Sequence, residues 1–153
     1  SYKSTERTSF KLDGSNIVVY FDHPEGWTQV KNTSLDMLFF SPQEAERLFG
    51  FHFFENSTFC LTNVNDFMVF VDWLTKSVFE DLPRTKVSIE TSKTFGKCSF
   101  ILTKKDGEKI YNFVYIAPIN ENMFFGIINT SKISKEEAFD DAKQLIGNIS
   151  WTK

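Results

Sequence analysis

The stretch CSFILTKKDGEKIYNFVYIA, Cys98 to Ala117, places two apolar and β-branched runs on either side of Asp106-Gly107. An Asp-Gly pair in this setting predicts a two-residue type I′ hairpin, because both turn positions need a positive φ. The turn fixes the register, so that Lys105 lies opposite Glu108 and the residues further along pair in step. One face of this hairpin must be covered by another layer, most simply by the helix expected from Asn65. It carries Cys98, Phe100, Leu102, Tyr111, Phe113 and Tyr115.

Two helices are expected, one before and one after this hairpin. Residues Asn65 to Leu82 place apolar side chains on one stripe at helical spacing, and Pro83 stops the helix. Residues Ser134 to Gly147 form a second amphipathic helix, whose first turn carries a capping box of Ser134 and Glu137. Together with the hairpin, these helices predict an α+β fold in which an antiparallel sheet is flanked by helices.

The other elements are expected to be short and to belong to a single domain that spans residues 1–153. A helical turn is predicted between Ser41, as its N-cap, and Gly50. The first residues, 1–9, are interpreted as a polar, flexible leader. Strands are predicted from β-branched and aromatic content at 17–21, 35–40, 51–55 and 123–128, with shorter candidates at 59–61 and 87–89.

The composition is that of a globular domain with a high aromatic content. Hydrophobic residues make up 41% of the 153 positions and charged residues 24%, which allows a sizeable core. The chain contains 18 Phe, so a Phe-rich core is expected, and some rings could line a binding groove. The net charge of −3 and the lack of a long basic run argue against nucleic-acid binding. No apolar run approaches the ~20 residues that a membrane-spanning helix needs.

The chain begins at Ser1 without a methionine. A polar first segment is what remains when a signal or a lipid anchor has been removed. An exported, periplasmic or membrane-anchored protein is therefore favoured over a cytoplasmic one.

The segment IVVYFDHPEGW, Ile17 to Trp27, ends a strand with a Pro-x-Gly-Trp turn. Pro24 cannot donate to a sheet and Gly26 permits positive φ, so the strand stops there. Strands, a capped helix, an antiparallel meander and a last helix running into Ile149-Ser150-Trp151 follow. This order of elements resembles the PsbP-like family. That family is an α/β/α sandwich shared by a photosystem subunit, a Ran-binding nuclear import factor and small bacterial envelope lipoproteins.

The resemblance covers Ile17 to Trp151 and implies a fold and a general role. It implies that the first strand lies in the sheet and that Trp27 folds back as a core anchor. It also implies that the domain acts through protein contacts without catalysis. It assigns no individual functional residue, because the acidic pairs at 80–81 and 140–141 match no binding cluster of the family.

Neither a cofactor nor a metal is expected from the sequence. Walker, dinucleotide and G-x-S-x-G motifs are missing, and the two histidines, His23 and His52, lie without metal-ligand spacing. His23 is interpreted as a satisfied surface residue. Cys60 and Cys98 are too far apart for a zinc site. Cys98 is expected to be a buried free thiol, and a disulfide with Cys60 stays open if the domain is exported.

A non-catalytic protein-binding or assembly module is the favoured function, with a basic or amphipathic protein as the partner. The chain itself is expected to be a monomer or a weak oligomer. One alternative is a small hydrolase or ligand-processing enzyme that uses the Asp22-His23-x-Glu25 turn. Another is a carrier of a small apolar ligand held between helix and sheet.

Trp73 is the expected anchor of the binding site. It lies off the buried stripe of its helix, beside Asp66 and Glu80. Phe124 alternates with Phe125, so one of these two rings is expected to face away from the main core. An aromatic patch rimmed by acids is a common interface composition. The alternative is that another segment of the chain covers these rings.

Overall fold

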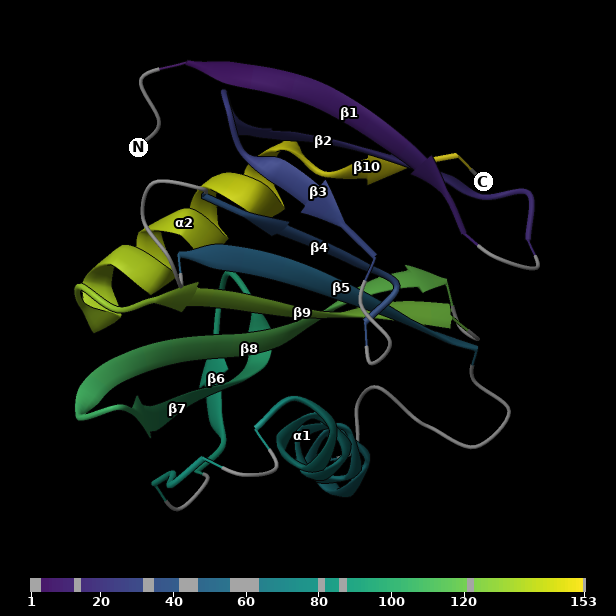
Figure 1. The fold of residues 1–153 in the computed structure, drawn as a ribbon. Coiled ribbons are helices and arrows are strands. Elements are labelled where there is room, and N and C mark those ends of the chain that lie inside the picture. Colours follow the sequence, from purple (N-terminus) through teal and green to yellow (C-terminus); the bar gives the residue numbers. More distant parts are fainter. Residues whose placement is uncertain are drawn as a thin grey trace.

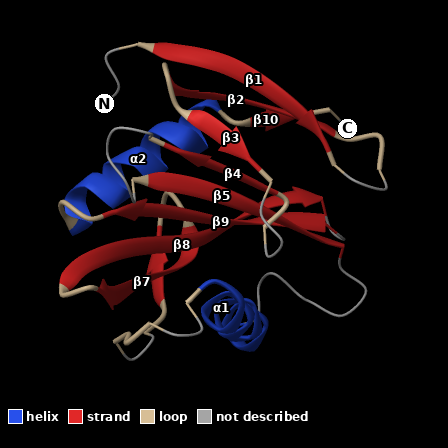
Figure 2. Cartoon of the chain, in the orientation of Figure 1, coloured by secondary structure: helices blue, strands red, loops and turns tan. Residues whose placement is uncertain are grey.

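The computed structural model describes residues 4–12, 15–31, 35–41, 47–55, 64–79, 82–85, 88–120 and 123–152, with backbone only at 37, 38, 40, 55 and 64–66. In these residues the chain forms two antiparallel sheets and two helices (Figures 1 and 2). The predicted α+β class is therefore confirmed.

The larger sheet is built around the predicted hairpin. Asp106 and Gly107 have φ values of 51° and 81°, as a type I′ turn requires. Lys105 pairs with Glu108, and Cys98 pairs with Tyr115, so the predicted register is confirmed. From edge to edge the strands are β3 (Thr28–Val30), β4 (Met37–Phe40), β5 (Leu48–Glu55), β9 (Met123–Ser131), β8 (Glu108–Asn120), β7 (Gly96–Lys105) and β6 (Glu90–Ser92).

The smaller sheet joins both ends of the chain, in the order β1 (Thr5–Lys11), β2 (Val18–Pro24), β10 (Ser150–Trp151). Two predictions are wrong here: residues 5–9 belong to a strand rather than to a flexible leader, and the first predicted strand, β2, lies outside the larger sheet. The polar residues of β1 are exposed except for Thr8, which is half-buried, whereas Phe10 packs on Phe21 and Phe51 with ring centroids 6.0 and 5.7 Å apart. A strand with one solvated face can be mostly polar, which is why its sequence resembles a leader.

Each face of the larger sheet is covered by one helix (Figure 1). Helix α2 (Lys135–Asn148) packs on the face that carries Phe113 and Tyr115, and helix α1 (Val64–Val78) packs on the opposite face, against Val114 and Ile128. The prediction that the helix from Asn65 covers the Phe113 face is therefore wrong. Both faces of β8 and β9 carry buried apolar side chains, so alternation alone could not assign a helix to each.

The smaller sheet lies on the same side of the larger sheet as α2. Phe21 of β2 is fully buried and meets Phe39 of β4 edge to face at 4.8 Å. The layers are thus α1, then the larger sheet, then α2 together with the smaller sheet (Figure 1). Phe residues fill both interfaces, as the composition predicts.

Both predicted helices are confirmed, with different ends. Helix α1 stops at Val78, short of the predicted Leu82. Ser134 caps α2, because its hydroxyl accepts the Glu137 amide at 3.0 Å. The Glu137 carboxylate accepts from the Ser131 hydroxyl at 2.8 Å, and the Ser134 amide donates to the same Ser131 oxygen at 3.4 Å, so only the Ser134 half of the predicted capping box forms. The turn predicted between Ser41 and Gly50 falls mainly on 42–46, outside the described residues, and β5 already begins at Leu48.

Two tryptophans tie loops and termini to the core. Trp27 is half-buried and stacks on Phe49 at 5.4 Å, so its expected role as an anchor is met by one face of the ring. Trp151 meets Phe125 edge to face at 5.9 Å and holds the end of the chain on the domain.

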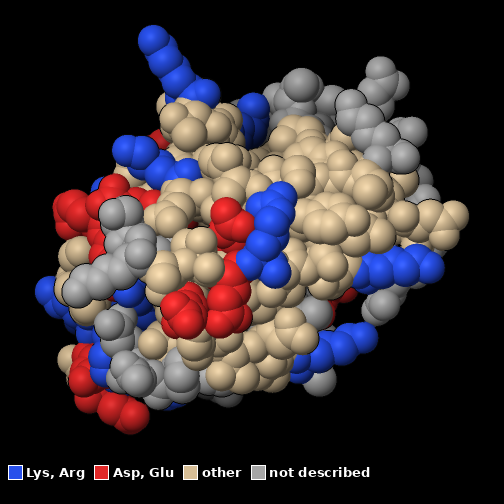
Figure 3. Space-filling model, turned by 90° about the horizontal axis from the view of Figure 1, so that it is seen from above, with Lys and Arg blue, Asp and Glu red and all other residues tan. Residues whose placement is uncertain are grey.

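Charged groups of both signs are interspersed over the face on the side of β1 (Figure 3). Arg7 and Asp22, for example, pair across β1 and β2 at 2.9 Å, with both side chains partly exposed. Among the described residues, this face offers no broad patch of a single sign.

Candidate functional site on the α1 face

The structure places the residues predicted for binding in different environments. Trp73 lies on α1 and is half-buried. Asp66 also belongs to α1, but its side chain is outside the described part, and Glu80 falls outside the described residues altogether. Phe124 is only 2% exposed and stacks on Phe54 at 4.8 Å beneath α1, so its predicted place in a surface patch is wrong. Phe125 faces the other layer, and both rings are therefore buried in separate cores.

Trp73 is held by aromatic neighbours from β5. His52 stacks on its indole with centroids 4.2 Å apart and an angle of 25°. Phe54 meets the same indole edge to face at 5.5 Å. Because two rings on a strand brace it, the Trp73 side chain is fixed in one orientation with part of its surface still open to solvent.

His52 is the residue of this site that was not predicted. Its Nδ1 lies 3.5 Å from the Asp36 carboxylate, which also accepts the backbone amide of Phe53. Burial lowers the pKa of His52 below its usual value, although Asp36 opposes this shift, so the ring is neutral at pH 7. The alternation in FGFHFF, which places His52 on the face of Gly50 and Phe54, is the signal that could have found it.

Val69 extends the aromatic site along the helix surface. It is 49% exposed and lies one turn before Trp73, so the two side chains are neighbours on α1. Exposed Asp72 and Lys76 flank them on the same helix. We call the pair Val69 and Trp73, with its support from His52, the Trp73 ridge.

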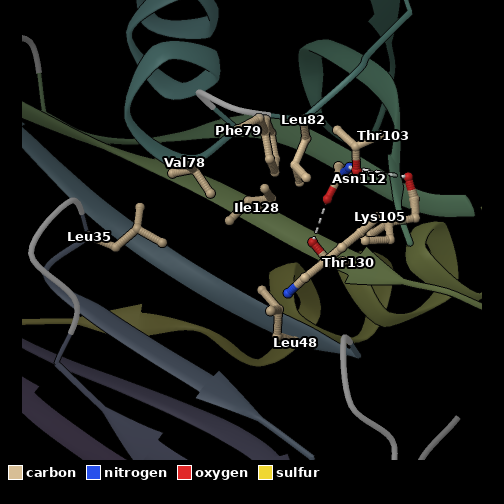
Figure 4. Close-up of a pocket in the computed structure, with 11 residues that line it drawn as sticks. Leu35, Leu48, Val78, Phe79, Leu82, Thr103, Lys105, Asn112, Ile128 and Thr130 are labelled. Carbon is tan, nitrogen blue, oxygen red and sulfur yellow. Dashed lines mark hydrogen bonds between the residues drawn. The ribbon is translucent and has the colours of Figure 1, made fainter. Parts of the chain in front are cut away.

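A cavity of about 170 Å³ lies on the same side of the sheet, at the C-terminal end of α1 (Figure 4). Buried side chains form its floor, whereas half-buried Leu48, Val78 and Leu82 and exposed Lys105 stand at its rim. We call it the α1 cavity. No feature of the sequence predicts it, because it results from how α1 and the segment after it rest on the sheet. Its floor contains Leu35, Phe79, Thr103, Ile110, Asn112, Ile128 and Thr130.

The polar groups of the cavity floor form a closed network (Figure 4). The Asn112 amide donates to the Ile101 and Ile110 carbonyls at 2.9 and 3.3 Å and to Thr103 Oγ1 at 3.2 Å. The Thr130 hydroxyl donates to Asn112 Oδ1 at 2.9 Å. The donors of the network are thus used internally, while the Thr130 oxygen keeps acceptor capacity.

A wider hollow of about 520 Å³ lies on the α2 side. Phe95, Ile146 and Trp151 are among the residues that line it.

The Asp22-His23-x-Glu25 turn does not assemble a catalytic pair. His23 is 3% exposed, which corrects its interpretation as a surface residue. Its Nε2 lies 2.8 Å from Thr8 Oγ1 and its Nδ1 lies 3.0 Å from the Pro24 carbonyl. Asp22 pairs with Arg7, and Glu25 accepts from the Ser4 hydroxyl at 2.7 Å, so neither carboxylate is engaged with the imidazole.

Cys98 is a buried free thiol, as expected, and Cys60 lies outside the described residues. Burial, together with the charge of Glu90, raises the pKa of Cys98, so the thiolate that nucleophilic chemistry needs is disfavoured. Among the described residues, no group of three or more metal-ligating side chains gathers in one place. Neither helix in the described part of the chain is long and apolar enough to cross a membrane.

The sequence matches no known protein-family model and no curated protein. The solved structures that are similar in fold include the following three. The solution structure of cyanobacterial PsbP (CyanoP) from Synechocystis matches 98% of this chain and 94% of that chain, with 11% identity and a TM-score of 0.60. LpqN of Mycobacterium tuberculosis, described as involved in cell envelope biogenesis, matches 97% of this chain and 92% of that chain, with 9% identity and a TM-score of 0.50. A protein from Bacteroides thetaiotaomicron matches 88% of this chain but only 45% of its own length, with 16% identity and a TM-score of 0.56.

Proposed function

Because the chain has the PsbP-like fold, which CyanoP and LpqN share, we propose that it is a non-catalytic module that docks a partner protein through the Trp73 ridge. The observation that carries the proposal is the combination of an exposed Val69 with a half-buried Trp73 that His52 and Phe54 hold in place.

Such a ridge has the physical properties of an interface anchor. Trp is enriched among the residues that contribute most to binding, since it brings a large apolar area with few rotatable bonds. Trp73 is already ordered by its stack on His52, so a partner would not have to immobilise it. Val69 adds apolar area one turn away, which suits a partner that lays an apolar stripe along α1.

The charges around the ridge favour a partner with basic groups beside its apolar stripe. Asp72 is exposed on α1, and the Asp36 side chain next to His52 is 34% exposed. Lys76 supplies one positive charge at the end of the ridge. The net charge of −3 acts in the same direction over longer distances. We therefore propose an amphipathic, basic protein segment rather than a nucleic acid as the partner.

We also propose that the protein acts outside the cytoplasm. LpqN, which has the same fold, is described as involved in cell envelope biogenesis. This supports an exported or envelope-associated role for the present chain. Fractionation of the source cells with an antibody to the chain tests this, and recovery only in the cytoplasmic fraction would overturn it.

The docking proposal is tested by photo-crosslinking in the source cells. A photoreactive phenylalanine analogue is placed at position 69, on the ridge, and at the matched position 133, where Ile133 is 62% exposed away from α1. We expect a discrete adduct from position 69 that is missing from position 133. Similar adducts from both positions, or none from position 69, would refute docking through the ridge.

A binding variant separates docking from folding. Val69→Asp places a charge on an exposed position and should leave the melting temperature unchanged. A tagged chain with this change should nevertheless fail to capture the partner that crosslinks at position 69. Ile133→Asp is the control with a similarly exposed apolar residue. Equal capture by both variants would contradict the proposal.

A further inference from the structure

Strand β1 forms an outer edge of the smaller sheet without the usual protections of an edge strand (Figure 1). The other edge strands of the two sheets, β3, β6 and β10, are only two or three residues long, and a very short edge strand offers little to another chain. β1 spans seven residues, contains no proline and pairs with β2 without a bulge. Its outer side is therefore a regular strand edge.

Every second residue of β1 points its backbone groups away from β2. In an antiparallel pair, hydrogen-bonded residues alternate with residues whose N–H and C=O groups point to the other side. The Ser4 carbonyl accepts from the Glu25 amide at 3.1 Å, and the Leu12 amide donates to the Ile17 carbonyl at 3.0 Å, so the even-numbered residues bond to β2. In the described part of the chain, no hydrogen bond engages the outward backbone groups. These groups belong to Thr5, Arg7, Ser9 and Lys11.

The charged side chains of β1 protect this edge only in part. Arg7 turns back across β2, where its guanidinium pairs with Asp22 at 2.9 Å and donates to the Ser150 hydroxyl of β10 at 3.2 Å. Its charge is therefore balanced by a partner and directed into its own sheet. Lys11 stands at the end of the strand, away from the middle of the edge. The middle of the edge thus remains accessible to a strand from another chain.

The sequence of β1 is complementary to a second copy of itself. Two identical edges that are related by a twofold axis pair antiparallel and offer each other the same surface. A register centred on Thr8 joins all four outward residues of each strand, with Arg7 opposite the partner subunit's Ser9 and Lys11 opposite the partner subunit's Thr5. A shift by two residues sets Arg7 opposite the partner subunit's Arg7 in one direction and opposite the partner subunit's Lys11 in the other. Like charges directly opposite each other are destabilising, so the register centred on Thr8 is favoured.

From these observations we propose that the chain forms a weak homodimer, in which β1 pairs antiparallel with the β1 strand of a second copy and the two smaller sheets join into one. The contact consists mainly of backbone hydrogen bonds from four residues of each strand, so the dimer forms only at high protein concentration. The proposal does not depend on docking at the Trp73 ridge, because α1 lies on the opposite side of the larger sheet (Figure 1).

Sedimentation equilibrium of the full chain, with the concentration raised into the millimolar range, tests for the dimer. Nuclear magnetic resonance spectra of the ¹⁵N-labelled chain over the same range locate the contact. We expect a monomer–dimer equilibrium, while the amide of Val30 on the exposed strand β3 keeps its position. A monomer at all concentrations, or shifts confined to another surface, would overturn the proposal. The backbone amides expected to shift and to saturate are those of Thr5, Arg7, Ser9 and Lys11.

A proline at the centre of the edge separates dimerisation from folding. Ser9→Pro removes an outward amide, and its ring occupies space that the second strand needs. Because this amide does not bond to β2, the variant should keep a melting temperature close to that of the parent. Its dimerisation should be weakened at least about tenfold, since a hydrogen bond is lost from each strand. Ser9→Ala is the matched control and should dimerise like the parent, whereas parent-like dimerisation of Ser9→Pro would refute pairing through β1.

Two charge variants at the same position test the register and keep the backbone amide, so they decide the proposal even if Ser9→Pro does not fold. Ser9→Glu sets a carboxylate opposite the partner subunit's Arg7, twice in the dimer, and should tighten it about three- to tenfold. Ser9→Lys sets an ammonium there and should weaken the dimer by a similar factor. Because the chain has a net charge of −3, an effect of overall charge alone would have the opposite sign. That opposite order, or equal dimerisation of both variants, would refute the proposed pairing.

Discussion

Replacing Gly126 with Ala should destabilise the domain far more than a single added methyl group suggests. Gly126 lies in β9 opposite His52, and a Cβ at this position would overlap the ring of Phe70 from α1. Phe70 is 2% exposed and meets Phe54 edge to face at 5.4 Å, so its ring cannot swing into solvent. Either α1 must lift from the sheet or the rings must leave their rotamers, and such overpacking costs about 1–3 kcal/mol.

A double-mutant cycle identifies the cause. Gly126→Ala, Phe70→Leu and the double variant are unfolded in urea, and the free energies of unfolding are compared. Phe70→Leu shortens the side chain that the new methyl group would strike, so the double variant should be less destabilised than the two single changes added together. A coupling of about 1 kcal/mol is expected for residues in direct contact. Additive effects would refute the close approach of α1 to β9 at Gly126, and so would a Gly126→Ala protein as stable as the parent.

Three further predictions concern other parts of the chain. Trp27→Ala should lower the free energy of unfolding by about 2–3 kcal/mol, which is less than for a fully buried Trp, because only one face of the ring stacks on Phe49. Thermal unfolding measures this loss, and a loss under about 0.5 kcal/mol would contradict an anchoring role. Asn112→Ala should cost about 2–4 kcal/mol in urea unfolding because it leaves the Thr130 hydroxyl unpaired, and adding Thr130→Val should recover part of the loss; no recovery would argue against the network. Because its pKa is lower in the folded chain, His52 binds fewer protons there than in the unfolded chain, so the free energy of unfolding should fall as the pH drops below about 6.5. His52→Gln should reduce the slope of the free energy of unfolding against pH. Identical slopes for this variant and the parent would refute the burial of a neutral imidazole.

The elements that the sequence predicts well are those whose signals are local. The Asp106-Gly107 turn needs two positive φ values, and this requirement alone sets the register of β7 and β8. The cap at Ser134 is equally local, since its hydroxyl accepts a hydrogen bond from the backbone amide of Glu137, only three residues further on.

The wrong predictions concern features that are set by contacts between residues far apart in the sequence. Strand β1 is mostly polar and gains its place by pairing with β2 and by burying part of Phe10, which its own composition does not reveal. Both faces of β8 and β9 carry buried apolar side chains, so the sequence could not say which helix covers Phe113 and which covers Val114.

The candidate site was predictable only in part. The position of Trp73 off the helix stripe predicts that its ring is not fully covered, and in the structure Trp73 is half-buried. Its support by His52 required the alignment of α1 over β5, which no local pattern specifies. Phe124 was misplaced because a sheet with two covered faces buries both members of an alternating pair. The α1 cavity is a product of packing and has no signature in the sequence.

The affinity of the purified partner for Val69→Asp and Ile133→Asp, measured by titration calorimetry beside the parent chain, tests the docking account most directly. Val69 and Ile133 are both exposed apolar residues, but only Val69 belongs to the Trp73 ridge. The account predicts that Val69→Asp weakens binding by at least about tenfold, because a charge is buried where an apolar side chain was covered, and that Ile133→Asp binds like the parent. Parent-like binding by Val69→Asp, or equal weakening by both changes, would contradict it.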